Sequence, residues 1–299
     1  MFSENSKVKC PICGEWSSEY LFSNNKYNPF ADTHFTHYSC TSSINHNLYS
    51  IMKCTNCDIA FQTQKPDEKE LSQLYGNVVD NLYLQEEKGR YKTFNNAVKN
   101  LNKLCPEKGK LLEIGSYTGI FLEIAKNNQW HAEGVELSSW ARNIAASRNI
   151  SLYSSLDDSI LNKVNHFDSI IMWDVIEHLT HPQDILKKAH KLLKPGGILG
   201  VSTIIIDSIS ASVLKKYYPF YLDMHLIYFT KRSLINILKN TGFEIIEFKR
   251  HKRYVSISYI LSKFSILKNI NKITFLRKIL SNIHFFCSFG VRDIYARKI

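Results

Sequence analysis

The sequence contains no run of about twenty uninterrupted apolar residues, and its beginning, MFSENSKVKCPICG, lacks a charged segment followed by an apolar one. Such runs mark a membrane-spanning helix and a secretory signal. We therefore expect neither a membrane span nor secretion, and a cytoplasmic location. At 299 residues and 44% hydrophobic composition, the chain is long enough to bury the core of a globular enzyme.

Acidic residues are nearly missing from the C-terminal part of the chain. Residues 249–299 contain twelve Lys or Arg and one acid, Asp293, so they carry the whole net charge of +11. A basic tail predicts an anionic partner, such as a membrane surface, a nucleic acid or a phosphorylated substrate. A solvated basic surface without a partner is the alternative. Residues 1–57 contain few Lys or Arg, which disfavours nucleic acid as the partner.

Seven cysteines in a chain without an export signal indicate a reducing compartment, where paired cysteines hold metal more often than they form disulfides. Two Cys-x-x-Cys pairs, CPIC and CTNC, suit one tetrahedral Zn²⁺. We predict a structural Zn²⁺ in a zinc-ribbon-like module over residues 1–64, with no open coordination position for a substrate. The predicted ligands are Cys10, Cys13, Cys54 and Cys57. Alternative ligands in the intervening loop are His34, His37 and Cys40.

Residues 65–108 are interpreted as a helical linker and cap, because apolar residues recur there three or four positions apart. The residues in this pattern are Leu71, Leu74, Tyr75, Phe94, Val98, Leu101 and Leu104. From Lys110 onward, apolar runs such as KLLEIG, FDSIIMWD and GILGVSTII alternate with amphipathic segments. This alternation indicates a parallel sheet covered on both faces. We predict a doubly wound, Rossmann-like α/β domain over residues 109–299, with ligands beyond the carboxyl ends of the central strands.

The C-terminal part predicts a helix, RSLINILKNTG, that starts near Thr230 as its N-cap and is closed by Gly242. The segments FEIIEFKR and VRDIYARK are predicted to be paired antiparallel strands, with a helical insertion over residues 255–288. Apolar residues in this insertion alternate with Lys and Arg. The insertion either packs on the sheet or lies on an anionic bilayer at the inner membrane face.

The turn in KLLEIGSYTGIFLEIAK joins a predicted strand to a predicted helix. Gly115 suits backbone angles closed to other residues, and Gly119 allows close approach of a ligand. Glu113 would repel a pyrophosphate but attract an ammonium or sulfonium group. Glu136, about twenty residues later, suits two ribose hydroxyls. Together these residues favour an adenosyl ligand with a cationic, phosphate-free end, which S-adenosylmethionine provides.

The sequence here resembles the class I S-adenosylmethionine-dependent methyltransferases. The likeness runs from about Lys110 to Phe248 and rests on the order of its motifs: LLEIGSYTGIFLEIA, GVELS, FDSIIMWDVIEHLTHP, LLKPGGILGVST and HLIYFTKRSLINILKNTGFEII. The resemblance implies a seven-stranded, mostly parallel sheet. It departs from the family at Tyr117, where many members have a glycine. The expected cofactor-binding residues are Glu113, Gly115, Ser116, Gly119, Glu136 and Asp174. Some deoxysugar methyltransferases are similar in having four cysteines ahead of this fold.

Methyl transfer to a hydroxyl needs alignment of the acceptor and removal of its proton. His178, after the fourth strand, and His225, before the helix at Thr230, are the candidate bases. A packing or hydrogen-bonding role is the alternative for each. Three tyrosines are candidates for an acceptor pocket or for packing in a lid: Tyr217, Tyr218 and Tyr221.

We therefore expect a methyltransferase for a small-molecule or glycan acceptor, for example a nucleotide- or lipid-linked sugar of a surface polysaccharide. Oxygen is the expected acceptor atom, with carbon or nitrogen as alternatives. A second hypothesis is an RNA or protein methyltransferase that docks through the zinc module and the basic tail. A third is a non-catalytic zinc-bearing scaffold. Tyr117 favours this hypothesis, and four residues disfavour it: Glu113, Gly115, Gly119 and Glu136. The sequence leaves the oligomeric state open.

Overall fold

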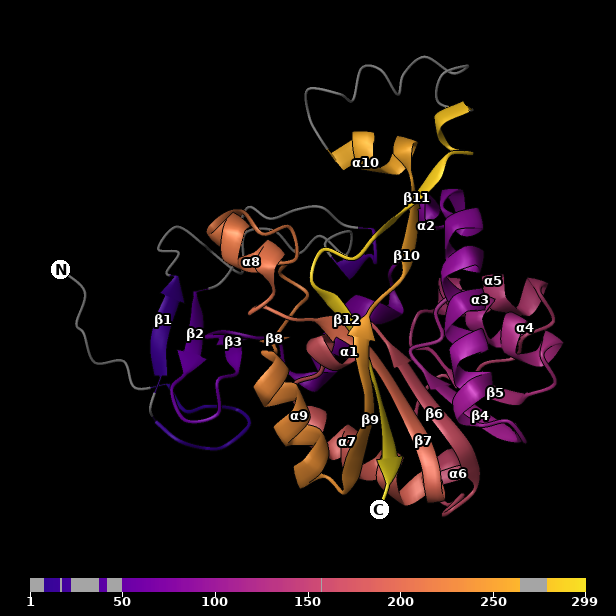
Figure 1. The fold of residues 1–299 in the computed structure, drawn as a ribbon, viewed down its shortest axis with the longest axis horizontal. Helices are drawn as coiled ribbons and strands as arrows, with labels where there is room; N and C mark the ends of the chain where they lie inside the picture. Colours follow the sequence, from indigo (N-terminus) through magenta and orange to yellow (C-terminus); the bar gives the residue numbers. More distant parts are fainter. Residues whose placement is uncertain (1–7, 17, 23–37, 42–49, 157, 264–278) are drawn as a thin grey trace.

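A computed structural model of the chain describes residues 8–16, 18–22, 38–41, 50–156, 158–263 and 279–299. Its centre is a six-stranded mixed sheet with the order β5-β4-β6-β7-β12-β9 (Figure 1). The strands are β4 (Lys110–Ile114), β5 (His131–Val135), β6 (Phe167–Trp173), β7 (Leu193–Ile204), β9 (Phe243–Arg250) and β12 (Val291–Lys298). Pairs among the first four strands are parallel, whereas β12 is antiparallel to both β7 and β9. The predicted antiparallel pairing of FEIIEFKR with VRDIYARK is confirmed.

The sheet has six strands and not the seven that the family resemblance implied. Beyond β5, the next segment makes a single parallel bridge, Val135 with Tyr153. The backbone there forms two hydrogen bonds, from Glu136 to Tyr153 and from Tyr153 to Gly134. Two bonds are too few to define a strand at this edge.

Helices cover both faces of the sheet, as its apolar strands predict. Alternate strand residues point to opposite faces, so Leu111 and Ile171 join one core cluster and Leu112 and Ile170 join the other. The first cluster includes side chains from α3 (Glu87–Leu104) and α4 (Ile120–Asn127), and the second includes side chains from α7 (Pro182–Leu192) and α9 (Lys231–Asn240). The shorter helices are α5 (Ser139–Ser147) and α6 (Asp158–Leu161).

The helix ends follow the capping signals in the sequence. Thr230 caps α9 with its side chain, as predicted, and Gly242 follows the helix with a φ of 90°. The expected helices in residues 65–108 are present, and Asp67 forms a capping box at the start of the first. They are α1 (Glu68–Gly76), α2 (Asn81–Gln85) and α3. Among the described residues, no helix is both long enough and apolar enough to cross a bilayer.

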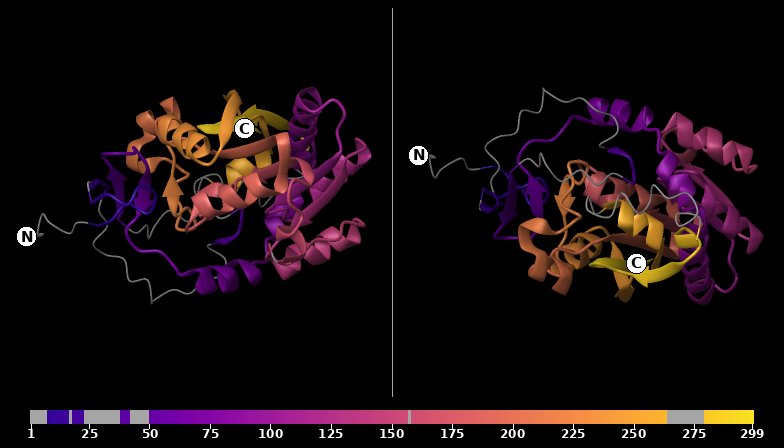
Figure 2. Two further views of the ribbon diagram at one scale, coloured as in Figure 1. Left: turned by 90° about the horizontal axis from the view of Figure 1, so that it is seen from below. Right: turned by 90° about the horizontal axis from the view of Figure 1, so that it is seen from above.

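A small antiparallel sheet carries the N-terminal cysteine pairs and lies at one end of the molecule, opposite α3, α4 and α5 (Figure 2). Its order is β1 (Ser18–Phe22), β2 (Ile51–Cys54), β3 (Ala60–Gln62) and β8 (Ile227–Tyr228). The last of these strands comes from a loop more than 160 residues further along the chain. That loop also contains α8 (Ile209–Leu214) and a short 3₁₀ turn, η3 (Lys215–Tyr217). A second 3₁₀ turn, η2 (Ile176–His178), follows β6. Backbone pairing of β3 with β8 therefore joins the cysteine-bearing sheet to the larger domain.

The insertion differs from the predicted helical stretch. Its described parts begin and end with strands, β10 (Arg253–Ser256) and β11 (His284–Cys287), which pair antiparallel. Between them lies α10 (Ile257–Lys263), and most of the remaining predicted helix falls outside the described residues. The hairpin lies against α3, where the backbone N–H of Tyr254 donates to Thr93 and Gly89 lies close to Tyr254 and His284. Figure 1 shows the hairpin extending from the end of the central sheet at which the parallel strands finish.

Candidate active site

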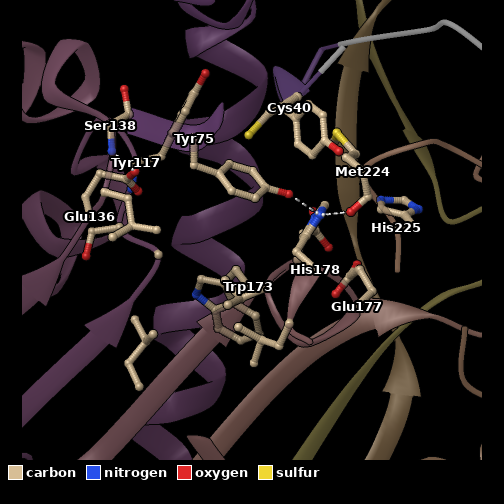
Figure 3. A pocket seen from close by; sticks show the side chains of 18 of the residues that line it. Cys40, Tyr75, Tyr117, Glu136, Ser138, Trp173, Glu177, His178, Met224 and His225 are labelled. Carbon is tan, nitrogen blue, oxygen red and sulfur yellow. Dashed lines mark hydrogen bonds between the residues drawn. The ribbon is translucent and has the colours of Figure 1, made fainter. Parts of the chain in front are cut away.

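A cavity of about 560 Å³ lies where β4, β5 and β6 end, at the position predicted for a ligand. Such a volume is typical of small-molecule sites. Figure 3 shows its side chains, with Tyr117 and Glu136 on one side, Glu177, His178 and His225 on the other, and Tyr75 between them. Most of the candidate site residues line this cavity: Glu113, Gly115, Ser116, Glu136, Asp174, His178 and His225.

Glu113 lies at the end of β4 and is almost completely buried. Its Oε2 atom has no hydrogen-bond partner among the described residues. Burial raises the pKa of Glu113 well above its usual range, because water no longer stabilises the charged form. A buried carboxyl oxygen that lacks a donor costs free energy. An ammonium group at this point of the cavity would supply both a donor and a positive charge.

The turn after β4 keeps left-handed geometry although it contains a tyrosine. Gly115 and Tyr117 have φ values of 77° and 45°. The ring of Tyr117 packs against Tyr83, with centroids 4.4 Å apart, and against Trp140 at 5.8 Å. Its backbone N–H donates to Oε2 of Glu136 at 2.8 Å. Tyr117 therefore forms part of the cavity wall and leaves the turn intact.

Glu136 is held in place by two backbone donors. Ser138 N–H donates to its Oε1 at 2.7 Å, opposite the bond from Tyr117. Burial raises the pKa of Glu136, and these two bonds oppose the rise by stabilising the carboxylate. The carboxylate lines the cavity with its remaining lone pairs, which suits acceptance from hydroxyl groups.

Gly119 lies outside the cavity lining. It has a φ of 76° and begins α4, and a Cβ atom there would lie 3.1 Å from Ala145 Cβ and 3.2 Å from Ile150. Its lack of a side chain therefore allows α4 to approach α5 closely. A role in cofactor binding for this residue stays a prediction.

Three cavity residues from the helical segment were not among the sequence candidates. The guanidinium of Arg90 lies 3.4 Å from the ring centroid of Tyr83, and its Nε atom is buried without a hydrogen-bond partner among the described residues. The third residue, Tyr75, has its hydroxyl oxygen within hydrogen-bonding distance of Nδ1 of His178. Arg90, Tyr83 and Tyr75 are hard to recognise as site residues from the sequence, because helix periodicity does not indicate which polar side chain faces a neighbouring domain.

His178 is fixed by a backbone carbonyl. Its Nδ1 lies 2.8 Å from the carbonyl oxygen of Met224 and 2.8 Å from the hydroxyl of Tyr75 (Figure 3). A carbonyl oxygen can only accept, so we assign the proton to Nδ1 and the lone pair to Nε2. Burial lowers the pKa of His178, which keeps the ring neutral near pH 7.

His225 has the same arrangement on the facing loop. Its Nδ1 lies 2.7 Å from the carbonyl oxygen of Phe220, which again places the lone pair on Nε2. Burial, reinforced by His178, lowers the pKa of His225 to about 3. The two imidazole rings meet edge to face with centroids 4.8 Å apart. Both candidate bases therefore lie together as neutral rings.

Asp174 stands at the end of β6 with a φ of 53°, a strained value for a residue other than glycine. It is paired with Arg253 of β10 and accepts a hydrogen bond from Ser202 at 3.0 Å. Burial alone would raise the pKa of Asp174, but the guanidinium of Arg253 and the neighbouring His251 hold it below its usual value. The insertion therefore contributes a cation to the cavity wall.

The aromatic lining differs from the predicted one. Tyr218 and Tyr221 are buried in a separate core cluster, and Tyr217 is 74% exposed. The hydroxyl of Tyr218 donates to the carbonyl of Phe289. The aromatic residues that line the cavity are Tyr38, Tyr75, Tyr83, Phe94, Tyr117, Trp173, Phe220, Tyr254 and Tyr259. Packing in the loop above the sheet, the alternative role expected for these residues, therefore explains Tyr218 and Tyr221 but not Tyr217.

The four predicted metal ligands form one cluster, with all sulfur atoms within 4.8 Å of one another: Cys10, Cys13, Cys54 and Cys57. Two of the contacts, Cys10 to Cys57 and Cys13 to Cys54, measure 3.7 and 3.5 Å. Sulfurs on a tetrahedral Zn²⁺ lie about 3.8 Å apart, so the donor set fits the ion.

The two cysteine loops match each other in shape. The residue after each pair, Gly14 or Asp58, has a positive φ, of 76° or 62°. In each loop this residue's N–H donates to the carbonyl of the first cysteine. The alternative ligand Cys40 lines the cavity and is not part of the cluster, and His34 and His37 lie outside the described residues.

Comparison with known proteins places the fold and the cavity in a family. A family model described as a methyltransferase domain matches residues 87–248. An uncharacterized protein of Methanocaldococcus jannaschii is 27% identical over 157 residues, which cover 52% of this chain and 73% of that protein. A ubiquinone biosynthesis O-methyltransferase of Coxiella burnetii is 34% identical over 104 residues, which cover 32% of this chain and 44% of that enzyme.

A solved structure agrees with the fold. A SAM-dependent methyltransferase from Archaeoglobus fulgidus superimposes with a TM-score of 0.51 and 19% sequence identity. The match covers 73% of this chain and 100% of that chain. At this identity the likeness concerns the fold alone.

Proposed function

The chain belongs to this methyltransferase-domain family, as an S-adenosylmethionine-dependent methyltransferase, and from that premise we propose that it methylates a hydroxyl group of a small acceptor. One observation carries the proposal. The cavity joins the carboxyl ends of β4 and β5 to a wall that presents His178 and His225. A cofactor on the first side and an acceptor on the second would meet inside one enclosed space. The ubiquinone-related relatives, which are O-methyltransferases by name, support oxygen as the acceptor atom.

The cofactor side of the cavity fits an amino acid joined to a nucleoside. Among the described residues, Oε2 of Glu113 and Nε of Arg90 have no hydrogen-bond partner. The first suits an ammonium group and the second a carboxylate. Glu136 suits the ribose hydroxyls. S-adenosylmethionine bound there would supply the methyl group from its sulfonium centre, and the rest of the cofactor would leave as a neutral thioether.

The acceptor side fits a neutral hydroxyl group. The Nε2 lone pair of His178 can accept a proton from a hydroxyl group, and its lowered pKa keeps the ring unprotonated near pH 7. His225, with a pKa of about 3, is a much weaker base, and its Nε2 lone pair would accept a hydrogen bond from the hydroxyl group. The aromatic lining would hold a sugar or another ring by stacking. We keep a nucleotide- or lipid-linked sugar as the proposed acceptor class, by analogy with the deoxysugar enzymes that the sequence resembles.

We propose further that the four-cysteine cluster holds a structural Zn²⁺. The ion would fix β2 and β3, because Cys54 ends β2 and Cys57 precedes β3. Through β8, this sheet supports the loop that carries His225. The small sheet would then stabilise the position of His225 on the acceptor side of the cavity.

Transfer of radioactive methyl from S-adenosylmethionine to a panel of hydroxylated acceptors tests the proposal. The panel should contain nucleotide sugars, catechols, RNA and a protein extract at low and high salt. Transfer to a small acceptor that falls in both His178→Ala and His225→Ala supports it. Transfer only to RNA or protein, weakening steeply with salt, would favour the docking hypothesis instead.

A further inference from the structure

Glu177, His178 and His225 form a compact group in the cavity wall. One potential ligand atom of each lies within 4.8 Å of the other two. Figure 3 shows the three side chains gathered on one side of the cavity. Glu177 is 1% exposed, and its Oε2 has no hydrogen-bond partner among the described residues. A buried carboxyl oxygen in this state needs a proton or a cation close by.

The hydrogen bonds of the two histidines prepare them as ligands. Each Nδ1–H is directed to a backbone carbonyl, of Met224 or Phe220, which leaves the lone pair on Nε2. Histidines that bind metals commonly donate their other ring N–H to a carbonyl in this way, because the bond fixes the tautomer and the ring orientation.

We propose that Glu177, His178 and His225 bind a divalent first-row transition-metal cation, with an open coordination position toward the cavity. Two imidazoles and one carboxylate form a donor set that holds catalytic zinc in other enzymes while leaving a position for a water or a substrate. All three residues line the cavity, so a ligand in the cavity can reach that position. Neighbouring ligand atoms on one such ion lie about 3.3 Å apart. Side-chain movements of about 1–2 Å would bring the three ligand atoms to this separation.

The surrounding charges permit a cation. Asp174 is neutralised by its ion pair with Arg253, which leaves Glu177 as the source of negative charge beside the two neutral rings. A divalent cation bound by Glu177 would supply the partner that its buried Oε2 atom lacks among the described residues.

The role of the ion rests on the proposed function. An acceptor hydroxyl at the open position would bind the cation, which lowers the pKa of that hydroxyl. The histidine lone pairs would then serve coordination, and the ion would replace an imidazole in activating the acceptor. The existence of the cation site is independent of methyl transfer, and it can be tested without an acceptor.

Optical titration with Co²⁺ tests the site in full-length protein whose zinc content is one equivalent. We expect one further equivalent of Co²⁺ to bind with visible d–d absorption and without thiolate charge-transfer bands, which would signal exchange at the four cysteines. Glu177→Gln and His225→Asn should each weaken Co²⁺ binding by at least about tenfold. The control His131→Ala changes an exposed histidine at the start of β5 and should leave binding unchanged.

Zinc content and circular dichroism show whether each variant is folded. If both ligand variants fail to fold, X-ray absorption of the wild-type Co²⁺ complex decides, because two imidazoles give a characteristic scattering pattern. No binding of Co²⁺, or binding unaffected by either ligand variant, would overturn the proposal. Calorimetry with S-adenosylhomocysteine on the same samples separates this outcome from failure of the proposed function.

Discussion

The side-chain amide of Gln62 donates a hydrogen bond to the backbone carbonyl of His225 at 2.9 Å, although 163 residues separate the two. The same amide reaches the carbonyls of Leu222 and Asp223, each at 3.1 Å. Gln62 ends β3 of the cysteine-bearing sheet and is 3% exposed. The small N-terminal sheet therefore holds the loop that presents a candidate catalytic histidine.

This connection predicts that loss of the cysteine cluster affects turnover more than cofactor binding. Zinc removal, or Cys57→Ser, should release β3 and the His225 loop and reduce methyl transfer at least tenfold. Affinity for S-adenosylhomocysteine should change less than about threefold, because Glu113 lies on β4 and Glu136 directly follows β5, both in the larger sheet. Calorimetry and turnover on the same preparation measure the two effects.

Gln62→Ala should reproduce part of this effect without touching a cysteine. It removes the donor from three buried carbonyls, which should lower the free energy of unfolding by about 1–3 kcal/mol. Gln73→Ala, on the exposed side of α1, is the control. Equal loss of cofactor affinity and turnover in Gln62→Ala would show that the small sheet does not act selectively on His225.

Tyr117 should tolerate glycine better than valine. Its φ of 45° is accessible to glycine, whereas a β-branched residue is strained there. We expect Tyr117→Gly to lose the ring contacts with Tyr83 and Trp140 but to keep cofactor binding. Tyr117→Val should lower the melting temperature further and weaken binding. A gain of affinity above about tenfold in Tyr117→Gly would mean that the ring obstructs the cavity.

Arg90 is expected to recognise the amino-acid end of the cofactor. Arg90→Gln should weaken binding of S-adenosylhomocysteine by about tenfold, the loss of one charge-assisted hydrogen bond. Binding of methylthioadenosine, which lacks the carboxylate, should not change. The control Lys88→Gln alters an exposed cation two positions away on α3. An equal loss for both ligands would assign Arg90 a structural role on Tyr83.

His225 should make the protein less stable in mild acid. An unfolded chain protonates this histidine near pH 6.5, whereas the folded protein does so only near pH 3. Between these values the unfolded state binds the extra proton, so stability falls as the pH falls. From pH 7.5 to 5.5 the wild type should lose about 1.4 kcal/mol more than His225→Asn in urea unfolding. The exposed-histidine variant His131→Ala should behave as the wild type, and identical losses in wild type and His225→Asn would contradict the pKa direction.

The parallel core could be predicted because each strand and helix has its own apolar period. The antiparallel pairing at the edge also followed, since both segments, FEIIEFKR and VRDIYARK, mix apolar with charged residues in the way that half-buried strands do. The prediction of a seventh strand was wrong, because a sequence motif does not show how many backbone hydrogen bonds an edge segment will make. The two strands of the insertion were not predicted for another reason. Their sequence pattern is only four residues long, and contacts with α3, which is distant in sequence, stabilise the strand conformation.

The site was predictable where local geometry defines it. Glu113 lies near the end of β4, and Glu136, Asp174 and His178 follow strands. The strand ends of a parallel sheet meet at one edge. Arg90 and Gln62 were missed because their partners lie in distant segments. A membrane contact through residues 249–299 stays a prediction. Two apolar side chains of β11, Phe285 and Phe286, are exposed, which is compatible with such a contact.

Calorimetric titration of the zinc-replete protein with S-adenosylmethionine and S-adenosylhomocysteine tests the central claim most directly. We expect saturable, one-to-one binding of both ligands, and a loss of at least tenfold in affinity in Glu136→Ala. The variant's melting temperature confirms that the turn at Tyr117 remains folded. Absence of binding by the folded wild-type protein would contradict the methyltransferase account and favour the non-catalytic scaffold.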